Sequence, residues 1–242
     1  MTGSANETIF FVHVMKTGGT TFVQHLEANF GSEERYPQAE RGWERQRAYY
    51  MIDELRALSP ERRRALRVYM GHFPFAASQL VGADVTMTVL RDPVDRTISF
   101  LRHSKRYQEK HRDKPLEEIY EDPWLFPLYI RNYQAKLFAM TSEDKLESHL
   151  DDIEVDEPRL RTACATLERV DVLGLSERYQ DFVDEVQRRF RWRIDPVKDL
   201  RVSTEDWNVT ASFRRRIAAD NAADVAFYEH AQELHERRRD AG

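Results

Sequence analysis

Apolar residues along this chain gather in four short runs, at about residues 9–14, 67–71, 85–90 and 170–174. Each run is nearly continuous and rich in β-branched or aromatic side chains, which is typical of strands buried on both faces of a parallel sheet. Elsewhere apolar residues recur at helical spacing, as Val94, Ile98 and Leu101 do. The pattern predicts one α/β domain over residues 1–242, with a short, mostly parallel sheet and helices on both faces, in three layers.

Longer polar stretches predict further helices, at about residues 31–60, 143–170 and 210–239. Pro127 argues for a loop before a helix that starts near residue 128. Residues 102–114 are strongly basic. We interpret them as a solvated helix end rather than as a landing site for an acidic acceptor.

The first run leads into a segment with the composition of an anion site. It reads Lys16, Thr17, Gly18, Gly19, Thr20 and Thr21. Phe22, Leu26 and Phe30 can then share one helical face, so a helix starting here would aim its unpaired N–H groups and positive dipole end at one spot. Lys16 adds a full charge, the glycines allow close backbone approach, and the threonines add hydroxyl donors. Alternatively, the glycines only close a turn between strand and helix.

The usual loop for nucleotide triphosphates has these residues in another order. That loop ends in Gly-Lys-Ser/Thr, and its hydroxyl holds Mg²⁺. Here Lys16 precedes both glycines. The segment from His13 to Thr21 instead resembles the 5′-phosphosulfate loop of sulfotransferases that use 3′-phosphoadenosine 5′-phosphosulfate (PAPS), in the carbohydrate branch typified by heparan sulfate O-sulfotransferases, with Met15 in place of the usual Pro. The fold that this resemblance implies is P-loop-like.

A second resembling segment follows the third apolar run. Arg91 comes directly after that run, Pro93 suits the first turn of a helix, and Asp92 suits its N-cap. Ser99 lies eight residues after Arg91. In the family that the segment resembles, such an Arg and Ser hold the 3′-phosphate of the donor, and a guanidinium suits this task because it can bind a phosphate with two N–H groups. Arg96 can pair locally with Asp92 instead.

The second run ends in Gly71 and His72. Ligands of parallel α/β sheets bind beyond the carboxyl ends of the strands, so we expect His72 near the Lys16 loop. A His there can accept a proton near neutral pH. The Gly-His pair also resembles one in carbohydrate sulfotransferases in which the His is the general base. The alternative is a His that packs beside Phe73, and the second candidate base, His13, has a place inside the first run that favours a core role.

Three further segments resemble parts of the same family. Ser176 follows the fourth run, and the resemblance puts it near the adenosine end of the donor. Residues 132–134 (Asn-Tyr-Gln) resemble a segment near the cleft, although we favour a core helix with locally satisfied polar groups. Asn221 and Asp224 resemble a closing pattern of the family, which we interpret as structural.

Composition narrows the class of protein. The 242 residues, 41% hydrophobic and 33% charged, suit a globular domain with a proper core. A net charge of −5 argues against a dedicated nucleic-acid binder. The single Cys164 excludes an internal disulfide and fits a reducing compartment. No run reaches the roughly 18–20 apolar residues of a membrane span, and no signal peptide is evident, so we expect a cytoplasmic, bacterial member of the family.

The resemblance therefore implies a PAPS-dependent sulfotransferase. Lys16 would bind the 5′-phosphosulfate, the backbone of Thr17 to Thr21 would hold the 5′-phosphate, Arg91 and Ser99 would hold the 3′-phosphate, and His72 would deprotonate an acceptor hydroxyl on a small molecule or glycan. No metal is expected, and the oligomeric state is open. Two alternatives remain at this point: a small-molecule kinase with a P-loop, and a non-catalytic module that binds sulfated or phosphorylated ligands.

Overall fold

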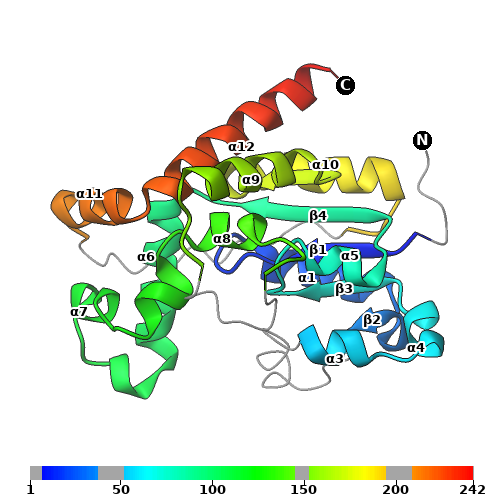
Figure 1. Ribbon diagram of the computed structural model, residues 1–242, viewed down its shortest axis with the longest axis horizontal. Helices are drawn as coiled ribbons and strands as arrows, with labels where there is room; N and C mark the ends of the chain where they lie inside the picture. Colours follow the sequence, from blue (N-terminus) through cyan, green and yellow to red (C-terminus); the bar gives the residue numbers. More distant parts are fainter. Residues whose placement is uncertain (1–6, 38–51, 145–152, 195–208, 242) are drawn as a thin grey trace.

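The computed structural model of the chain describes residues 7–37, 52–144, 153–194 and 209–241 (Figure 1). Within these ranges five strands form one sheet in the order β2-β3-β1-β4-β5, and all neighbouring strands are parallel. The strands are β1 (Ile9–Val12), β2 (Arg35–Tyr36), β3 (Val68–Gly71), β4 (Val85–Leu90) and β5 (Val172–Leu175). The predicted α/β class with a parallel sheet is confirmed.

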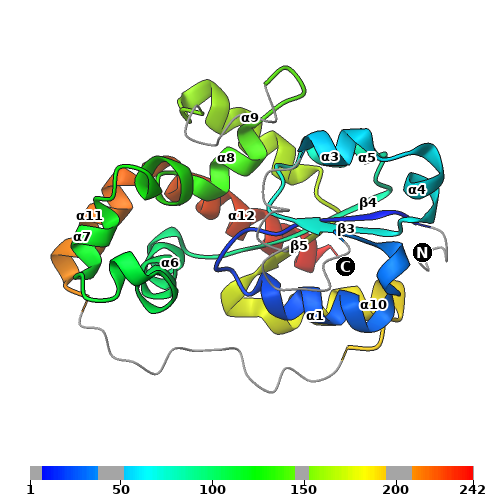
Figure 2. The ribbon, with the colours of Figure 1, turned by 90° about the horizontal axis from the view of Figure 1, so that it is seen from below.

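The central strands are buried on both faces, as their apolar runs predict. Ile9 and Phe11 pack against α1 (Gly19–Asn29) and α10 (Tyr179–Phe190). Phe10 and Val12 point to the opposite face. That face is covered by α3 (Ile52–Ala57), α5 (Ala77–Val81), α8 (Tyr133–Ala139), α9 (Glu157–Glu168) and α12 (Ala222–Asp240). Figure 2 shows α1 and α10 on one side of the sheet and α3 and α5 on the other.

The edge strand β2 differs from the sequence-based expectation, which has only helices between residues 31 and 60. This strand pairs Arg35 with Val68 and Tyr36 with Tyr69. Two residues are too few to show alternation or an apolar run, so hydrophobic patterning does not reveal them. The rest of that stretch contains a 3-10 turn at Ser32–Glu34, α3 and α4 (Pro60–Ala65), while residues 38–51 lie outside the described part.

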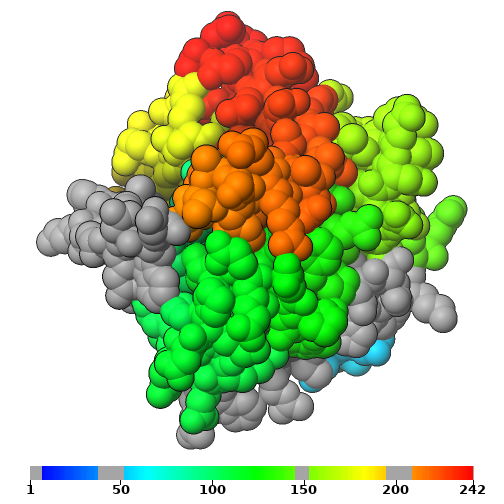
Figure 3. All heavy atoms as spheres, turned by 90° about the vertical axis from the view of Figure 1, so that its left-hand side faces the viewer, coloured from blue at the N-terminus to red at the C-terminus, as the bar shows by residue number. Residues whose placement is uncertain are grey.

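A third apolar cluster lies beside the sheet. It joins α6 (Pro93–Tyr107), α7 (Leu116–Tyr120), a π-helical segment (Phe126–Ile130) and α11 (Ala211–Asp220). Figure 3 shows the surface of α11, in orange, directly against the green surface of this part of the chain. Arg214 of α11 pairs with Asp95 at 2.7 Å, and Arg216 pairs with Glu121 at 2.6 Å. None of the described helices combines the length and apolar character needed to cross a bilayer.

Two predicted helices are interrupted. The helix expected from about residue 128 divides into the π-helical segment and α8, because Asn132 between them has a left-handed backbone with φ of 50°. The predicted helix over 210–239 is confirmed but divides into α11 and α12 at Asn221. Asn residues tolerate such irregular backbone because their short side chains bond to nearby backbone groups.

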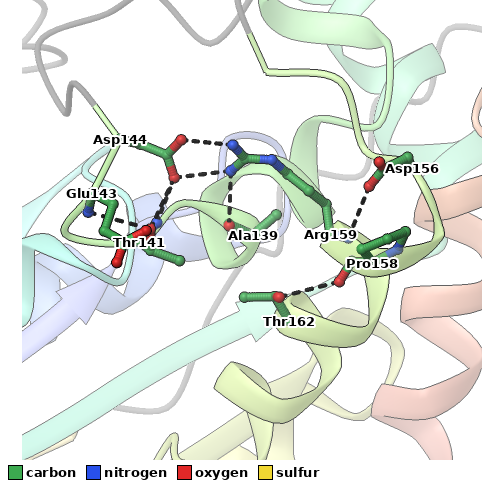
Figure 4. A network of polar contacts seen from close by, with 8 residues as sticks. All are labelled: Ala139, Thr141, Glu143, Asp144, Asp156, Pro158, Arg159 and Thr162. Atoms are coloured by element: carbon green, nitrogen blue, oxygen red, sulfur yellow. Dashed lines mark hydrogen bonds and ion pairs between the residues drawn. The ribbon is translucent and has the colours of Figure 1, made fainter.

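The helix expected over residues 143–170 is present from Glu157 to Glu168, and residues 145–152 lie outside the described part. Figure 4 shows the polar contacts between the segment that follows α8 and the start of α9. Arg159 of α9 binds the carboxylate of Asp144 with both terminal nitrogens, at 2.7 and 2.8 Å. Asp156 caps α9 by accepting from the N–H of Arg159 at 2.9 Å. This network fixes the start of α9 against the end of α8.

Candidate functional site

Three neighbouring strands bring the predicted site residues to one edge of the sheet. Val12 of β1 pairs with Gly71 on one side and with Thr88 on the other, so the carboxyl ends of β3, β1 and β4 lie together. His72 follows β3 and Arg91 follows β4 at this edge. Because these strands are all parallel, the Lys16 loop, His72 and Arg91 follow strand ends at the same edge of the sheet.

The segments that carry Lys16 and Arg91 are in direct contact. Nη1 of Arg91 donates to the carbonyl oxygen of Lys16 at 3.3 Å. Lys16 has a left-handed backbone with φ of 68°, which is uncommon for a residue with a side chain. The Arg91 guanidinium therefore braces the turn that presents Lys16.

The charge around Lys16 is concentrated. Burial, followed by the positive charges of Arg96 and Arg106, lowers the pKa of Lys16 from 10.5 to about 8. Arg96 is completely buried. Its Nε and Nη1 find no hydrogen-bond acceptor among the described residues. An anion at this point would relieve the mutual repulsion of the cations.

The loop itself needs both glycines. Gly18 has φ of 94°, a conformation that side chains disfavour. A Cβ on Gly19 would lie 2.3 Å from Cδ2 of His13, so the imidazole occupies the space of any side chain there. Helix α1 starts at Gly19 without a hydrogen bond from a capping side chain. The N-cap position, Gly18, therefore leaves the first N–H groups of this helix without a side-chain cap.

The threonines of the loop contribute unequally. Thr17 is fully buried, and its hydroxyl donates to the carbonyl of Val14 at 2.9 Å. The N–H of Thr21 donates to the carbonyl of Gly18 at 3.0 Å. Thr17 thus uses its hydroxyl hydrogen to close the loop, and Thr21 uses its N–H in the first turn of α1. The exposed Thr20 stands at the start of that helix.

His72 is buried and contacts His13. Its Nδ1 is hydrogen-bonded to the carbonyl oxygen of His13. A carbonyl only accepts, so Nδ1 carries the hydrogen and Nε2 carries the lone pair. Burial, followed by the proximity of His13, lowers the pKa of His72 well below 6.5. His72 is therefore neutral at neutral pH, in the form that accepts a proton.

The position of His13 differs from the expectation. The strand that was expected to reach residue 14 ends at Val12, so His13 lies just beyond it and is half-buried. Its ring stacks on Phe11 at 5.4 Å and lies 4.3 Å from the ring of His72. His13 thus belongs to the same edge of the sheet as the Lys16 loop.

Helix α6 begins as predicted. Asp92 caps it by accepting from the N–H of Asp95 at 2.9 Å, and Ser99 is half-buried two turns along. Arg96 does not pair with Asp92, because it turns into the core and donates to the carbonyl of Tyr129. Its guanidinium also lies 4.8 Å from the ring centroid of Tyr133.

A comparison with protein families identifies the general class. The model of the sulfotransferase family matches residues 2–224. The chain belongs to the sulfotransferase family. The general chemistry of this family is sulfuryl transfer. A search of curated proteins gave no match.

Two residues of α6 in this sulfotransferase, His103 and Arg106, lie close to Lys16. Burial, followed by the charges of Lys16 and Arg106, lowers the pKa of His103 to about 4. His103 and Arg106 are thus close enough to act electrostatically on Lys16 or to be affected by it. Together with Ser99 they recur at spacings of four and three residues, which places them on one helical face. This spacing is the sequence signal for a shared face, although residues 102–114 as a whole are interpreted above as a solvated helix end.

Ser176 lies at the same edge of the sheet but further from Lys16. It begins a 3-10 turn directly after β5, and β4 separates β5 from β1. Tyr179, which follows this turn, is the neighbour that a Cβ on Gly18 would meet, at 3.7 Å. The turn after β5 therefore borders the loop of this sulfotransferase through Tyr179.

A second polar set, which joins α6 to the segments after it, has the residue types of a hydrolase triad. The hydroxyl of Ser104 lies 2.7 Å from Nδ1 of His111, and Nε2 of His111 lies 3.3 Å from Oδ2 of Asp122. Ser104 is fully buried and His111 is 1% exposed, so no substrate reaches the hydroxyl. The set fastens the loops after α6 to the helix. Among the described residues, no three His, Cys, Asp or Glu side chains form a group that could hold a metal.

Proposed function

We propose that the protein transfers a sulfuryl group from PAPS to a hydroxyl of a carbohydrate or of a metabolite that contains one. The observation that carries this proposal is the hydrogen bond from Arg91 to the carbonyl of Lys16. It joins the segment that resembles a 3′-phosphate site to the segment that resembles a 5′-phosphosulfate site. A nucleotide with phosphates on both positions can then reach both. The carbohydrate acceptor rests on the likeness of the loop and of the Gly71-His72 pair to the carbohydrate branch.

The chain's own groups fit such a donor. The N-cap residue of α1, Gly18, offers no side-chain cap, and Lys16 lies among the positive charges of Arg96 and Arg106. Asp224 is a nearby counter-charge for Arg96, but Nε and Nη1 of Arg96 have no hydrogen-bond acceptor among the described residues. Arg91 and Ser99 flank the first two turns of α6, so a phosphate between them would meet a guanidinium and a hydroxyl. ATP lacks a 3′-phosphate and would leave this second site unused.

The proposed chemistry assigns one task to each group. The donor, when bound, supplies the sulfur that is transferred. Nε2 of His72 would take the proton of the acceptor hydroxyl while its oxygen bonds to sulfur. The bond from sulfur to the 5′-phosphate oxygen breaks, and its electron pair stays on that oxygen. Lys16 and the first N–H groups of α1 would stabilise the growing negative charge, as in phosphoryl transfer.

The first experiment measures melting temperature with 3′-phosphoadenosine 5′-phosphate (PAP), with adenosine 5′-monophosphate (AMP) and with ATP plus Mg²⁺. A ligand that binds only the folded protein raises the melting temperature by mass action. We expect the largest rise with PAP, its loss in Arg91→Ala, and no loss in Arg214→Ala, which removes an exposed Arg on α11. A rise only with Mg²⁺-ATP would favour the kinase.

Turnover separates an enzyme from a binding module. We expect sulfuryl transfer from PAPS to a panel of hydroxyl acceptors, and loss of most of it in Lys16→Ala or Arg91→Ala. Unchanged turnover in both variants would refute the proposed site. Binding of PAP without transfer to any acceptor would instead favour a non-catalytic module.

A further inference from the structure

The backbone of Arg91 is held by the side chain of Gln134 in α8. Oε1 of Gln134 accepts from the N–H of Arg91 at 3.1 Å, and Nε2 of Gln134 donates to the carbonyl of Arg91 at 2.7 Å. The two residues are 43 positions apart in the chain, and Gln134 is fully buried. One amide thus holds both polar backbone groups of Arg91, immediately beyond the end of β4.

Gln134 is itself fixed by Asp224 of α12. The carboxylate of Asp224 accepts from the N–H of Gln134 at 3.2 Å and from the N–H of Ala135 at 2.7 Å. These N–H groups belong to the first turn of α8, where no partner within the helix exists. The carboxylate therefore caps α8 from another helix and fixes the backbone position of Gln134.

A second pair of contacts closes the same junction. The N–H of Asn132 donates to Oδ1 of Asn221 at 2.8 Å, and the N–H of Asp224 donates to Oδ1 of Asn132 at 3.1 Å. Asn132, Gln134, Asn221 and Asp224 are all at most 9% exposed. A buried polar network of this kind fixes geometry when its members are satisfied.

A purely structural role explains the cap and the two asparagines, but it leaves the choice of Gln134 unexplained. Both of its amide groups contact Arg91, whose guanidinium donates to the carbonyl of Lys16. Contacts therefore run without interruption from Asp224 through Gln134 and Arg91 to the carbonyl of Lys16.

We propose that Gln134 is a positioning residue for Arg91, and that Asp224 holds Gln134 in place. The inference rests on the proposed function, in which Arg91 binds the 3′-phosphate. Gln134 would then set the discrimination between nucleotides with and without that phosphate, although it does not touch the ligand itself.

The test measures Kd for PAP and for AMP in the wild type and in Gln134→Leu. We expect the substitution to raise the Kd for PAP by about tenfold or more, and the Kd for AMP by less than about twofold. In an Arg91→Ala background Gln134→Leu should change neither value further, because coupled residues are not additive. Gln134→Glu is the second variant. It keeps the shape and the contact to the N–H of Arg91, but it repels the carbonyl, so we expect an intermediate loss of PAP affinity.

Leu137→Ala is the matched control, since Leu137 is a fully buried residue of the same helix without a polar contact to Arg91. It should lower the melting temperature and leave the ratio of PAP to AMP affinity unchanged. Folded Gln134→Leu or Gln134→Glu protein with a wild-type ratio would overturn the inference, as would an equal change of the ratio in Leu137→Ala. A wild type with no preference for PAP would overturn the proposed function and this inference with it.

Discussion

The imidazole of His13 fills the space beside the Cα of Gly19, where a methyl group would lie 2.3 Å from Cδ2 of the ring. The loop around Lys16 and the pair of histidines are therefore packed against each other as one unit. His13 also accepts, through its carbonyl, the hydrogen bond that fixes the tautomer of His72. A change at Gly19 should thus reach both the anion loop and the proposed base.

We expect Gly19→Ala to destabilise the protein by about 1–3 kcal/mol and to weaken PAP binding, because the added methyl overpacks the contact with His13. Chemical denaturation and a PAP titration measure the two effects. The double variant Gly19→Ala/His13→Ala should recover part of both losses, since it removes the clashing ring. Absence of any recovery would contradict this account.

The affinity for PAP should depend on pH through Lys16. Its pKa of about 8 in the free protein leaves it mostly charged at pH 7. A bound anion favours the charged form, so the contribution of Lys16 is full below pH 8 and falls as pH rises above 8, by up to about tenfold per unit. Isothermal titration between pH 7 and 9 measures this loss.

Lys16→Arg provides the comparison, because a guanidinium stays charged throughout this range. Its affinity should be nearly independent of pH from 7 to 9, whatever its absolute value. If the variant shows the same decline as the wild type, another group is responsible.

Replacement of His72 by Gln should separate catalysis from binding. We expect kcat to fall about 10²–10⁴-fold, the usual contribution of a general base, with PAP affinity within about twofold of the wild type. Because burial depresses the pKa of His72, the acid limb of the kcat profile should lie below pH 6.5. His230→Gln, on α12, is the control and should keep wild-type kcat.

The ion pair of Asp144 with Arg159 gives a prediction on stability. The hydrogen bonds from Arg159, the largest cause, help to lower the pKa of Asp144 from 3.8 to about 2. Asp144→Asn should lower the unfolding free energy by about 1–3 kcal/mol at pH 7, since it removes the charge from these bonds. Urea denaturation measures the difference.

The same ion pair fixes how that difference depends on pH. A carboxylate with a depressed pKa in the folded state contributes fully above about pH 4, and its contribution is lost as pH falls toward 2. The difference in unfolding free energy between the wild type and Asp144→Asn should therefore become smaller from pH 4 to pH 3. A difference that is constant over this range would assign the effect to packing rather than to charge.

Sequence reasoning was strongest where a strand ends in a charged or glycine-containing segment. Parallel strands put Lys16, His72 and Arg91 at one edge without any knowledge of strand order. The sequence does not predict the contact between Arg91 and the carbonyl of Lys16, because no sequence pattern indicates the left-handed backbone of Lys16. The position of His13 was missed for a related reason, since the strand ends two residues earlier than its apolar run.

Contacts between distant segments were the other limit. Sequence reasoning favours a structural role for Gln134 and Asp224. Gln134 contacts Arg91 across 43 positions of the sequence, and Asp224 contacts Gln134 across 90. Arg96 has a charge that suggests a surface residue, yet the fold buries it completely. Side chains of this kind are placed by tertiary packing, which local periodicity does not report.

The order of the strands divides the molecule's tasks in a way that bears on divergence. Under the proposed function, β1 leads into the Lys16 loop and lies between β3, which precedes the proposed base His72, and β4, which precedes Arg91 and Ser99. Mutations on the β3 side can then alter which hydroxyl is presented to His72 while Arg91 and Ser99 keep the same nucleotide. Acceptor specificity can thus diverge among descendants of one gene while the residues that bind the sulfate donor stay unchanged.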